Sequence, residues 1–143
     1  MFRTVLLAVD LQHEESWRRA LPEAAKIARD NGGTLHLVAV VPDFGMSMVG
    51  GYFPESFERD ALRRAEAELE DWAAANRPEG LEPAVHLGHG DVAAEILRVA
   101  HAVAADLVVV AAHKGRTARD YLVGSNAHRV VRDGELSVLV VRG

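Results

Sequence analysis

A polar, basic segment in the second half of the chain has the composition of an anion site. Between Ala112 and Val123 the sequence contains Gly115 and four cationic or ionisable residues, and Gly124-Ser125-Asn126 follows directly before an apolar helical pattern; the four are His113, Lys114, Arg116 and Arg119. A glycine and a hydroxyl residue at a helix start let backbone N–H groups face a phosphate. The alternative is ordinary helix capping by Ser125 or Asn126, which does not require the four basic neighbours.

A second candidate is Asp10, which ends the first apolar run of the chain, Thr4 to Val9. A carboxylate at the end of a buried strand can accept a hydrogen bond from a ligand hydroxyl, or it can cap the loop that follows. The sequence leaves both interpretations open.

Other chemistries find less support. The segment after Asp10 lacks the phosphate-binding pattern G-x4-G-K-S/T and the dinucleotide-binding pattern G-x-G-x-x-G. The third predicted strand, Pro83–Leu87, ends in His86-Leu87-Gly88 rather than in an aspartate that could accept a phosphoryl group. His86, His89 and Asp91 lie close together, but the spacing offers no further ligand, so we interpret these histidines as incidental. His113 could supply a hydrogen bond or a pH-dependent charge. No nucleophile with an adjacent base can be identified, so any hydrolysis of a bound ligand would be slow.

The strands that must position these residues are short and apolar. Thr4–Val9, Leu35–Val41 and Leu107–Val110 are apolar almost throughout, which is typical of strands buried on both faces of a parallel sheet. Two weaker strands are predicted at Pro83–Leu87 and Val138–Val141.

Helical patterns separate the strands. The first runs from Trp17 to Ala28 and contains Pro22, which could kink it or delay its start. The second places Phe57, Ala61, Ala65, Leu69 and Trp72 on one face and the solvated charges Glu58, Arg59, Arg63, Glu66 and Glu70 on the other. Asp91 is predicted to cap a third helix with Ile96, Leu97 and Ala100 inward, and a short fourth begins near Asn126 with Ala127, Val130 and Val131 inward.

The alternation of strands and helices predicts an α/β fold in a single domain, residues 1–143, with a doubly wound, mainly parallel five-stranded sheet. In such folds ligands bind outside the carboxyl ends of the strands, where the strand order reverses. Asp10 and the basic segment both follow strands at that end.

The chain resembles the universal stress protein family along nearly its whole length, through Thr4–Asp10, Gly90-Asp91, Ala105–Val110 and Ser137–Val141. Nucleotide-binding members carry a G-x2-G-x9-G-S/T loop after the fourth strand. Gly124-Ser125 occupies the final pair, whereas Ala111 and Lys114 stand at the first two glycine positions. Tyr121–Ala127 looks like the branch in which the early glycines are replaced, and members of that branch also bind ATP.

The resemblance implies an adenine nucleotide α-hydrolase-like fold that binds ATP or another adenine nucleotide, with or without Mg²⁺. It implies that Ala8, Val9 and Asp10 line the ribose and adenine side and that Val40 faces the adenine. The run from Ala111 through Ala112 and His113 to Lys114, Gly115 and Arg116 would pass beneath the nucleotide. Gly124, Ser125 and Asn126 would hold the phosphates.

Composition limits the partners. The formal charge of −5 and the pI near 5.8 make nucleic acid an unlikely partner, since nucleic acids favour basic surfaces. No apolar stretch reaches membrane-spanning length and no signal peptide is recognisable, so we expect a cytoplasmic protein without membrane insertion. The sequence has no cysteine, which excludes disulfides and thiolate metal sites.

Two segments point to contacts between chains. The apolar last strand, Ser137 to Val141, is expected at a sheet edge, and the resemblance implies a homodimer formed through it. Asp43–Phe57 is rich in glycine, methionine and aromatic residues, which suits a lid, a subunit contact or a loop folded on its own domain. The leading hypothesis is therefore an ATP-binding regulator of an unknown client protein in stress response. The alternatives are a nucleotide-independent dimeric interaction module and a slow ATPase.

Overall fold

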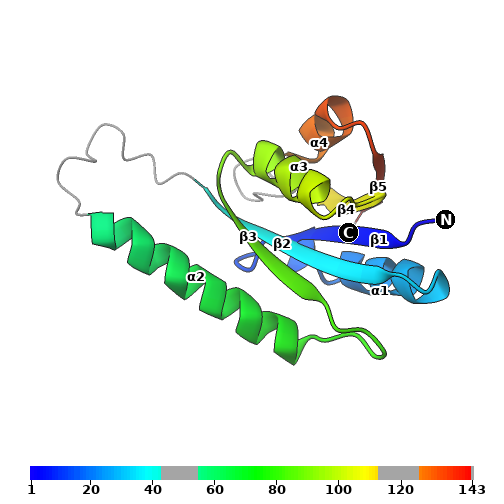
Figure 1. The fold of residues 1–143 in the computed structure, drawn as a ribbon, viewed down its shortest axis with the longest axis horizontal. Coiled ribbons are helices and arrows are strands. Elements are labelled where there is room, and N and C mark those ends of the chain that lie inside the picture. The colour runs from blue at the N-terminus through cyan, green and yellow to red at the C-terminus, as the bar shows by residue number, and fades with distance from the viewer. Residues whose placement is uncertain (43–54, 113–125, 143) are drawn as a thin grey trace.

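Five parallel strands form one sheet through the centre of the molecule (Figure 1). The computed structural model describes residues 1–42, 55–112 and 126–142. The strands are β1 (Thr4–Val9), β2 (Thr34–Pro42), β3 (Ala84–Gly90), β4 (Leu107–Ala112) and β5 (Ser137–Arg142). All five predicted strands are confirmed, and the largest difference is in β3, which continues beyond Leu87 to Gly90.

The strand order is β3-β2-β1-β4-β5, and every neighbouring pair is parallel. The order reverses between β1 and β4, as the predicted doubly wound fold requires. Val5 of β1 lies opposite Leu35 of β2 on one side and Leu107 of β4 on the other. The continuous apolar runs are explained by this central position, because both faces of β1 and β4 are buried.

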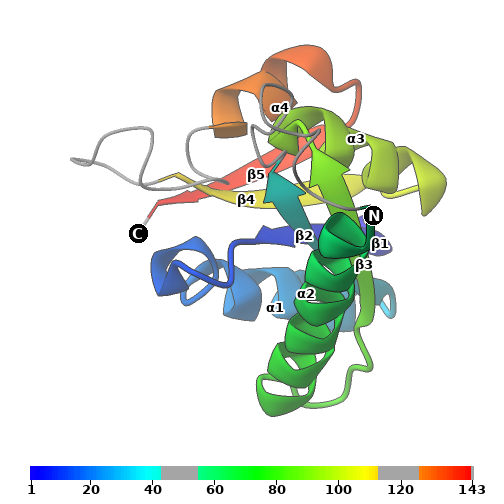
Figure 2. The same ribbon diagram turned by 90° about the vertical axis from the view of Figure 1, so that its left-hand side faces the viewer.

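Helices cover both faces of the sheet (Figures 1 and 2). Helices α1 (Ala20–Asp30) and α2 (Glu55–Ala75) lie on one face, and α3 (Val92–Ala102) and α4 (Ala127–Asp133) lie on the other. Successive strand side chains alternate between the faces. Val5, Leu7 and Val9 therefore pack with α1 and α2, whereas Leu6 and Ala8 pack with α3 and α4.

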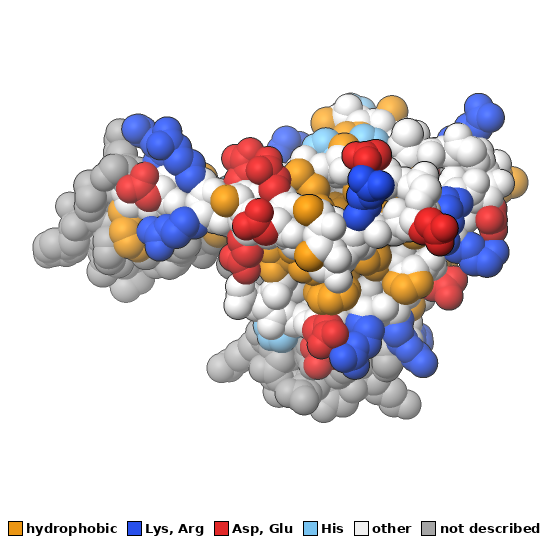
Figure 3. Space-filling view, turned by 90° about the horizontal axis from the view of Figure 1, so that it is seen from below, with side chains coloured by type: hydrophobic (Ala, Val, Ile, Leu, Met, Phe, Trp, Pro, Cys, Tyr) orange, Lys and Arg blue, Asp and Glu red, His pale blue; other side chains and the backbone are white. Residues whose placement is uncertain are grey.

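Helix α2 departs from the prediction in its first turns. Within the described part of this helix only Leu69 and Ala73 are buried, and Phe57, predicted to face inward, is 38% exposed. The first turns of α2 are exposed because the beginning of the helix stands away from the sheet (Figure 1), and charged side chains gather at this end of the molecule (Figure 3). The predicted solvated face is confirmed, since Glu58, Arg59, Arg63, Glu66 and Glu70 are all exposed.

Two other helices correct details of the prediction. Helix α1 begins at Ala20, not Trp17, and Pro22 falls in its first turn, where the missing N–H costs nothing. Trp17 lies in the turn before α1, after a short 3-10 helix, η1 (Glu14–Ser16). In α4, Val131 is 52% exposed rather than inward, because Val130 faces the sheet and the next residue is turned by about 100°.

The ends of α3 and the sheet match the prediction. Asp91 caps α3, and its Oδ2 accepts a hydrogen bond from the backbone N–H of Ala94 at 3.0 Å. In the described residues β5 pairs with β4 alone, so the last strand is an edge strand as expected.

Candidate functional site at the carboxyl end of the sheet

Most of the predicted site residues that the structure describes lie at one end of the sheet. Val9 ends β1 and Asp10 follows it, Val40 lies near the end of β2, and Ala111-Ala112 ends β4. Asn126 directly precedes α4. Ala8 is buried on the face covered by α3 and α4. His113, Lys114, Gly115, Arg116, Gly124 and Ser125 lie outside the described residues, as does most of the segment Asp43–Phe57.

A hollow of about 180 Å³ opens where β1 and β2 end beneath α2. Predicted residues Val9, Asp10 and Val40 contribute to its wall, together with Leu11, Gln12, Ala39, Val41, Ala65, Glu68 and Leu87. Its wall is apolar except for Asp10, Gln12 and Glu68. An apolar slot with a few polar groups at its rim is the usual form of a small-molecule site.

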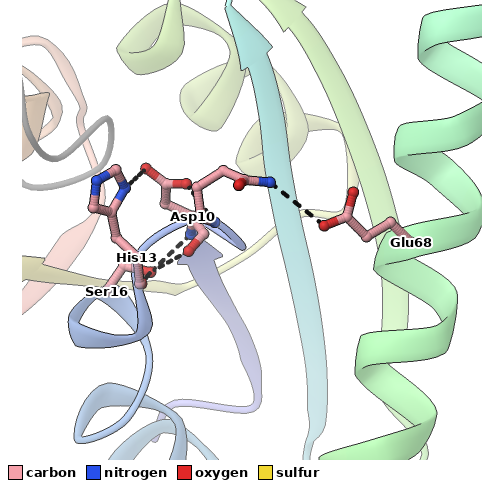
Figure 4. A network of polar contacts seen from close by, with 5 residues as sticks. Asp10, His13, Ser16 and Glu68 are labelled. Atoms are coloured by element: carbon pink, nitrogen blue, oxygen red, sulfur yellow. Dashed lines mark hydrogen bonds and ion pairs between the residues drawn. The ribbon is translucent and has the colours of Figure 1, made fainter.

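The Asp10 carboxylate is buried and held in one orientation (Figure 4). Its Oδ1 accepts a hydrogen bond from the backbone N–H of Gln12 at 3.0 Å, and its Oδ2 lies 2.9 Å from Nδ1 of His13. Both partners come from the turn that Asp10 begins, which is the local bonding that favours aspartate after a strand. Asp10 therefore caps its loop and also presents a fixed carboxylate at the hollow, so the two interpretations of this residue are compatible.

Ser16 fixes the backbone of Asp10. Its Oγ accepts from the Asp10 N–H at 2.8 Å and lies within donating distance of the carbonyl oxygens of Asp10, at 2.9 Å, and His13, at 2.7 Å. The residue is 3% exposed. The 3-10 turn at Glu14–Ser16 thus folds back so that the Ser16 hydroxyl fixes the backbone directly after β1.

Gln12 and Glu68 meet across the hollow. Nε2 of Gln12 lies 3.5 Å from Oε1 of Glu68, which comes from the middle of α2 (Figure 4). Both side chains are exposed, so the contact is weak and can be displaced by a ligand. With Asp10, the two residues are the polar part of the lining of the hollow.

A second polar group lies where α3 and α4 begin. The Arg129 guanidinium forms two bonds with Asp91, from Nη1 to Oδ1 at 2.8 Å and from Nη2 to Oδ2 at 2.9 Å, and Nη1 also donates to Oδ1 of Asn126 at 3.2 Å. The bonds from Arg129, and then the Ala94 N–H, hold the pKa of Asp91 below its usual range. The pair therefore stays ionised at neutral pH.

The histidines near β3 bind different partners. Nε2 of His86 lies 2.9 Å from Nδ1 of His36 on β2, and the two rings are stacked. Nδ1 of His89 lies 3.2 Å from Glu58 of α2. Asp91 pairs with Arg129, so His86, His89 and Asp91, whose sequence spacing suggested a metal site, each have a different partner. In the described ranges no group of three or more side chains of the metal-ligating types could hold a metal ion.

The prediction from sequence missed the contribution of α2 and β3 to the hollow. Ala65, Glu68 and Leu87 are distant in sequence from Asp10, and only the strand order brings them together. Leu11 and Gln12 were within reach of sequence reasoning, because they directly follow the strand-ending aspartate.

Comparison with known proteins identifies the family of this chain. The sequence model of the universal stress protein family matches residues 1–142. The chain belongs to the universal stress protein family. Universal stress protein G of Escherichia coli O157:H7 is 28% identical over 144 residues, which cover 99% of this chain and 100% of the relative.

Solved universal stress proteins have the same fold. One from Archaeoglobus fulgidus, in complex with dAMP, superposes with a TM-score of 0.69 at 23% identity and covers 98% of both chains. Another, in complex with cAMP, has a TM-score of 0.61 at 24% identity and covers 99% of this chain and 97% of its own. No helix in the described residues is both long and apolar enough to span a membrane.

Proposed function

We propose that this universal stress protein binds ATP or another adenine nucleotide at the carboxyl end of its sheet and regulates a client protein in the cytoplasm according to nucleotide occupancy. The observation that carries the proposal is the fixed, buried Asp10 carboxylate, which follows β1 at the point where strand order reverses and borders an apolar hollow beneath α2. That point is where open α/β sheets bind ligands. The dAMP and cAMP complexes of related structures support an adenine nucleotide.

The proposed arrangement follows the chemistry of the lining. The base lies in the hollow against the apolar side chains of Val40, Ala65 and Leu87. The ribose hydroxyls donate to Asp10, which is fixed in advance and so loses little entropy on binding. The phosphates extend from β1 toward β4, past Ala111-Ala112 and His113, to Gly124, Ser125 and Asn126. Lys114 and Arg116 supply positive charge, with or without Mg²⁺.

Calorimetry with ATP tests this proposal. Asp10→Asn keeps the size of the side chain but removes its charge, and we expect at least a tenfold loss of affinity, since a hydrogen bond to a charged group contributes about 1.5–3 kcal/mol. Asp30→Asn, at the exposed end of α1, is the matched control and should leave affinity unchanged. Unchanged ATP affinity in Asp10→Asn contradicts the placement of the ribose.

A bulky residue at Gly124 tests the phosphate end in the same way. We expect Gly124→Trp to abolish binding of ATP while the circular dichroism spectrum stays that of the folded protein. Unaltered affinity in this variant rejects the assignment of Gly124 to the phosphates.

A homodimer through β5 is part of the proposal. β5 is an edge strand whose Val138, Leu139, Val140 and Val141 are only partly buried, and an apolar edge favours pairing with a second chain. Light scattering at micromolar concentration should report a dimer, and Val140→Pro should convert it to a monomer. A monomer in the unmodified protein excludes the dimer, and a dimer that tolerates the proline excludes β5 as its interface.

A further inference from the structure

The outer edge of β3 borders a hollow between two helices. β3 is the first strand in the sheet order and pairs with β2 alone in the described residues, while α2 and α3 both contact it (Figure 1). The hollow has a volume of about 370 Å³. Its lining includes Val85, His86 and Leu87 of β3, Glu66 and Glu70 of α2, and Arg98 of α3. A second hollow shares Glu70 and Val85, so the depression continues along the strand.

The backbone of β3 presents hydrogen-bonding groups to this hollow. The N–H of His89 donates to Oε1 of Glu95 at 3.0 Å, so it points away from β2. The backbone groups of alternate strand residues point to the same side, and those of Leu87 and Val85 therefore face outward as well. In the described part of the chain no other element forms a backbone hydrogen bond with either residue. An edge strand with outward groups of this kind can pair with a further strand.

The charges around the hollow favour a basic partner. Glu66 and Glu70 lie one turn apart on α2, and both are exposed and without an ion-pair partner among the described residues. Arg98 is instead neutralised by Glu95, whose Oε2 accepts from its Nε at 2.8 Å. Burial lowers the pKa of His86, so its ring is neutral at pH 7. The uncompensated charge of the hollow is therefore negative, and it lies on the α2 side.

A second copy of this chain fits the β3 edge poorly. Antiparallel pairing of two β3 edges about a two-fold axis brings the same face of both sheets together, so Glu66 and Glu70 of one copy would approach the same residues of the other. Like charges in such positions repel. A partner strand with lysine or arginine at alternate positions has the opposite effect, because alternate side chains of a strand lie on one face and can all point toward α2.

We propose that the outer edge of β3 binds an extended segment of a client protein as an additional strand, with lysine or arginine at alternate positions facing Glu66 and Glu70. The inference rests on the client-binding part of the proposed function and not on nucleotide binding. It is compatible with a dimer through β5, because β3 and β5 lie at opposite edges of the sheet.

Hydrogen exchange measured by NMR tests the strand pairing, with the peptide Lys-Thr-Lys-Thr-Lys-Thr-Lys as the probe. The peptide should slow exchange of the Val85 and Leu87 amides about tenfold, whereas the His86 amide faces β2 and should be slow in both states. Val85→Pro removes an outward N–H without removing a bond to β2, so we expect a folded protein that binds the peptide about tenfold more weakly. Val85→Ala keeps the N–H and is the control.

Fluorescence anisotropy of the labelled peptide tests the charges. Glu66→Gln/Glu70→Gln should weaken binding about fivefold at low ionic strength and less at high ionic strength, since exposed ion pairs are weak and screened by salt. Glu23→Gln/Asp71→Asn is the matched control, because it removes two exposed carboxylates that do not line the hollow. A peptide with glutamate in place of lysine should not bind.

Several results would overturn the inference. These are no binding of the lysine peptide at about 1 mM, no slowing of exchange at Val85 and Leu87, or equal weakening by the two double variants, which would reduce the attraction to net charge. Slow exchange of both amides without peptide, lost on dilution, would assign the edge to a second copy.

Calorimetry with ATP on the same proteins separates the two proposals. Glu66→Gln/Glu70→Gln should leave ATP affinity unchanged, because neither residue lines the hollow beside Asp10. A protein that binds the peptide but not ATP loses only the nucleotide part of the proposed function, and a protein that binds ATP but not the peptide rejects only the β3 site.

Discussion

Replacing Ser16 by alanine should destabilise the fold and the site together. The substitution removes one oxygen atom from a residue that is 3% exposed, so it adds no bulk. The hydroxyl is the acceptor for the Asp10 N–H at 2.8 Å, and in Ser16→Ala that buried donor loses its partner. The carbonyl oxygens of Asp10 and His13 lose a shared donor in addition.

The magnitude follows from the asymmetry of hydrogen bonds. An intact pair contributes about 1 kcal/mol, whereas a buried donor left unsatisfied costs about 1–3 kcal/mol. For a chain of this size each kcal/mol lowers the melting temperature by roughly 3–4 °C, so we expect a decrease of about 3–10 °C. Because Ser16 holds the backbone that carries Asp10, the affinity for ATP should fall as well.

Urea denaturation and thermal unfolding of Ser16→Ala measure the effect. Glu15→Ala changes an exposed side chain in the same turn and should shift the free energy of unfolding by less than about 0.5 kcal/mol. A Ser16→Ala protein as stable as the Glu15→Ala control would refute the reasoning, because it would mean that the Asp10 N–H gains an equivalent partner without Ser16.

Three further predictions concern stability. Burial, and then the charge of neighbouring groups, lowers the pKa of both His36 and His86, so the unfolded chain binds protons more readily. Their contribution to stability is complete above about pH 6.5 and is lost as the pH falls toward their pKa values in the folded protein. Urea denaturation should therefore give a lower free energy of unfolding at pH 5.5 than at pH 7.5, and the difference should be smaller in a His36→Asn/His86→Asn double variant. Gly33→Ala would place a Cβ atom against the backbone carbonyl of Arg3, closer than two such atoms can approach, and chemical denaturation should report a loss of about 1–3 kcal/mol. Ala104 has a φ of 54°, so Ala104→Gly should raise the free energy of unfolding by up to about 1 kcal/mol, and a decrease would show that the left-handed conformation carries no strain here.

The strands could be predicted because burial on both faces leaves a local signature. Val5–Val9 and Leu107–Ala111 are apolar without interruption, and no other common element of that length combines such a run with flanking turn residues. The Asp91 cap was predictable for a similar reason, since a cap bonds the backbone three residues away. Val131 was misassigned because a two-residue apolar pair at the end of a short helix does not reveal which member faces inward.

The contacts that could not be predicted from the sequence join residues that are far apart in the chain. The His36–His86 pair joins residues separated by fifty positions, and Arg129 reaches back thirty-eight positions to Asp91. Neither contact has a local pattern. No local pattern predicts the α2 side of the hollow either, because Ala65 and Glu68 lie on a helix that is exposed to solvent over most of its length.

The position of Asp10 follows from how the chain crosses the sheet. The path from β1 through α1 to β2 and through α2 to β3 keeps both helices on one face, whereas α3 and α4 lie on the opposite face. At the carboxyl ends of β1 and β4 the connections therefore leave toward opposite faces, and nothing in the strand order closes the gap between them. Asp10 stands at that gap and needs its own supports, because an unsupported carboxylate at a buried strand end would be costly. The turn from Gln12 to Ser16 supplies them, which explains how a loop with no recognisable nucleotide motif holds a buried carboxylate in a fixed orientation.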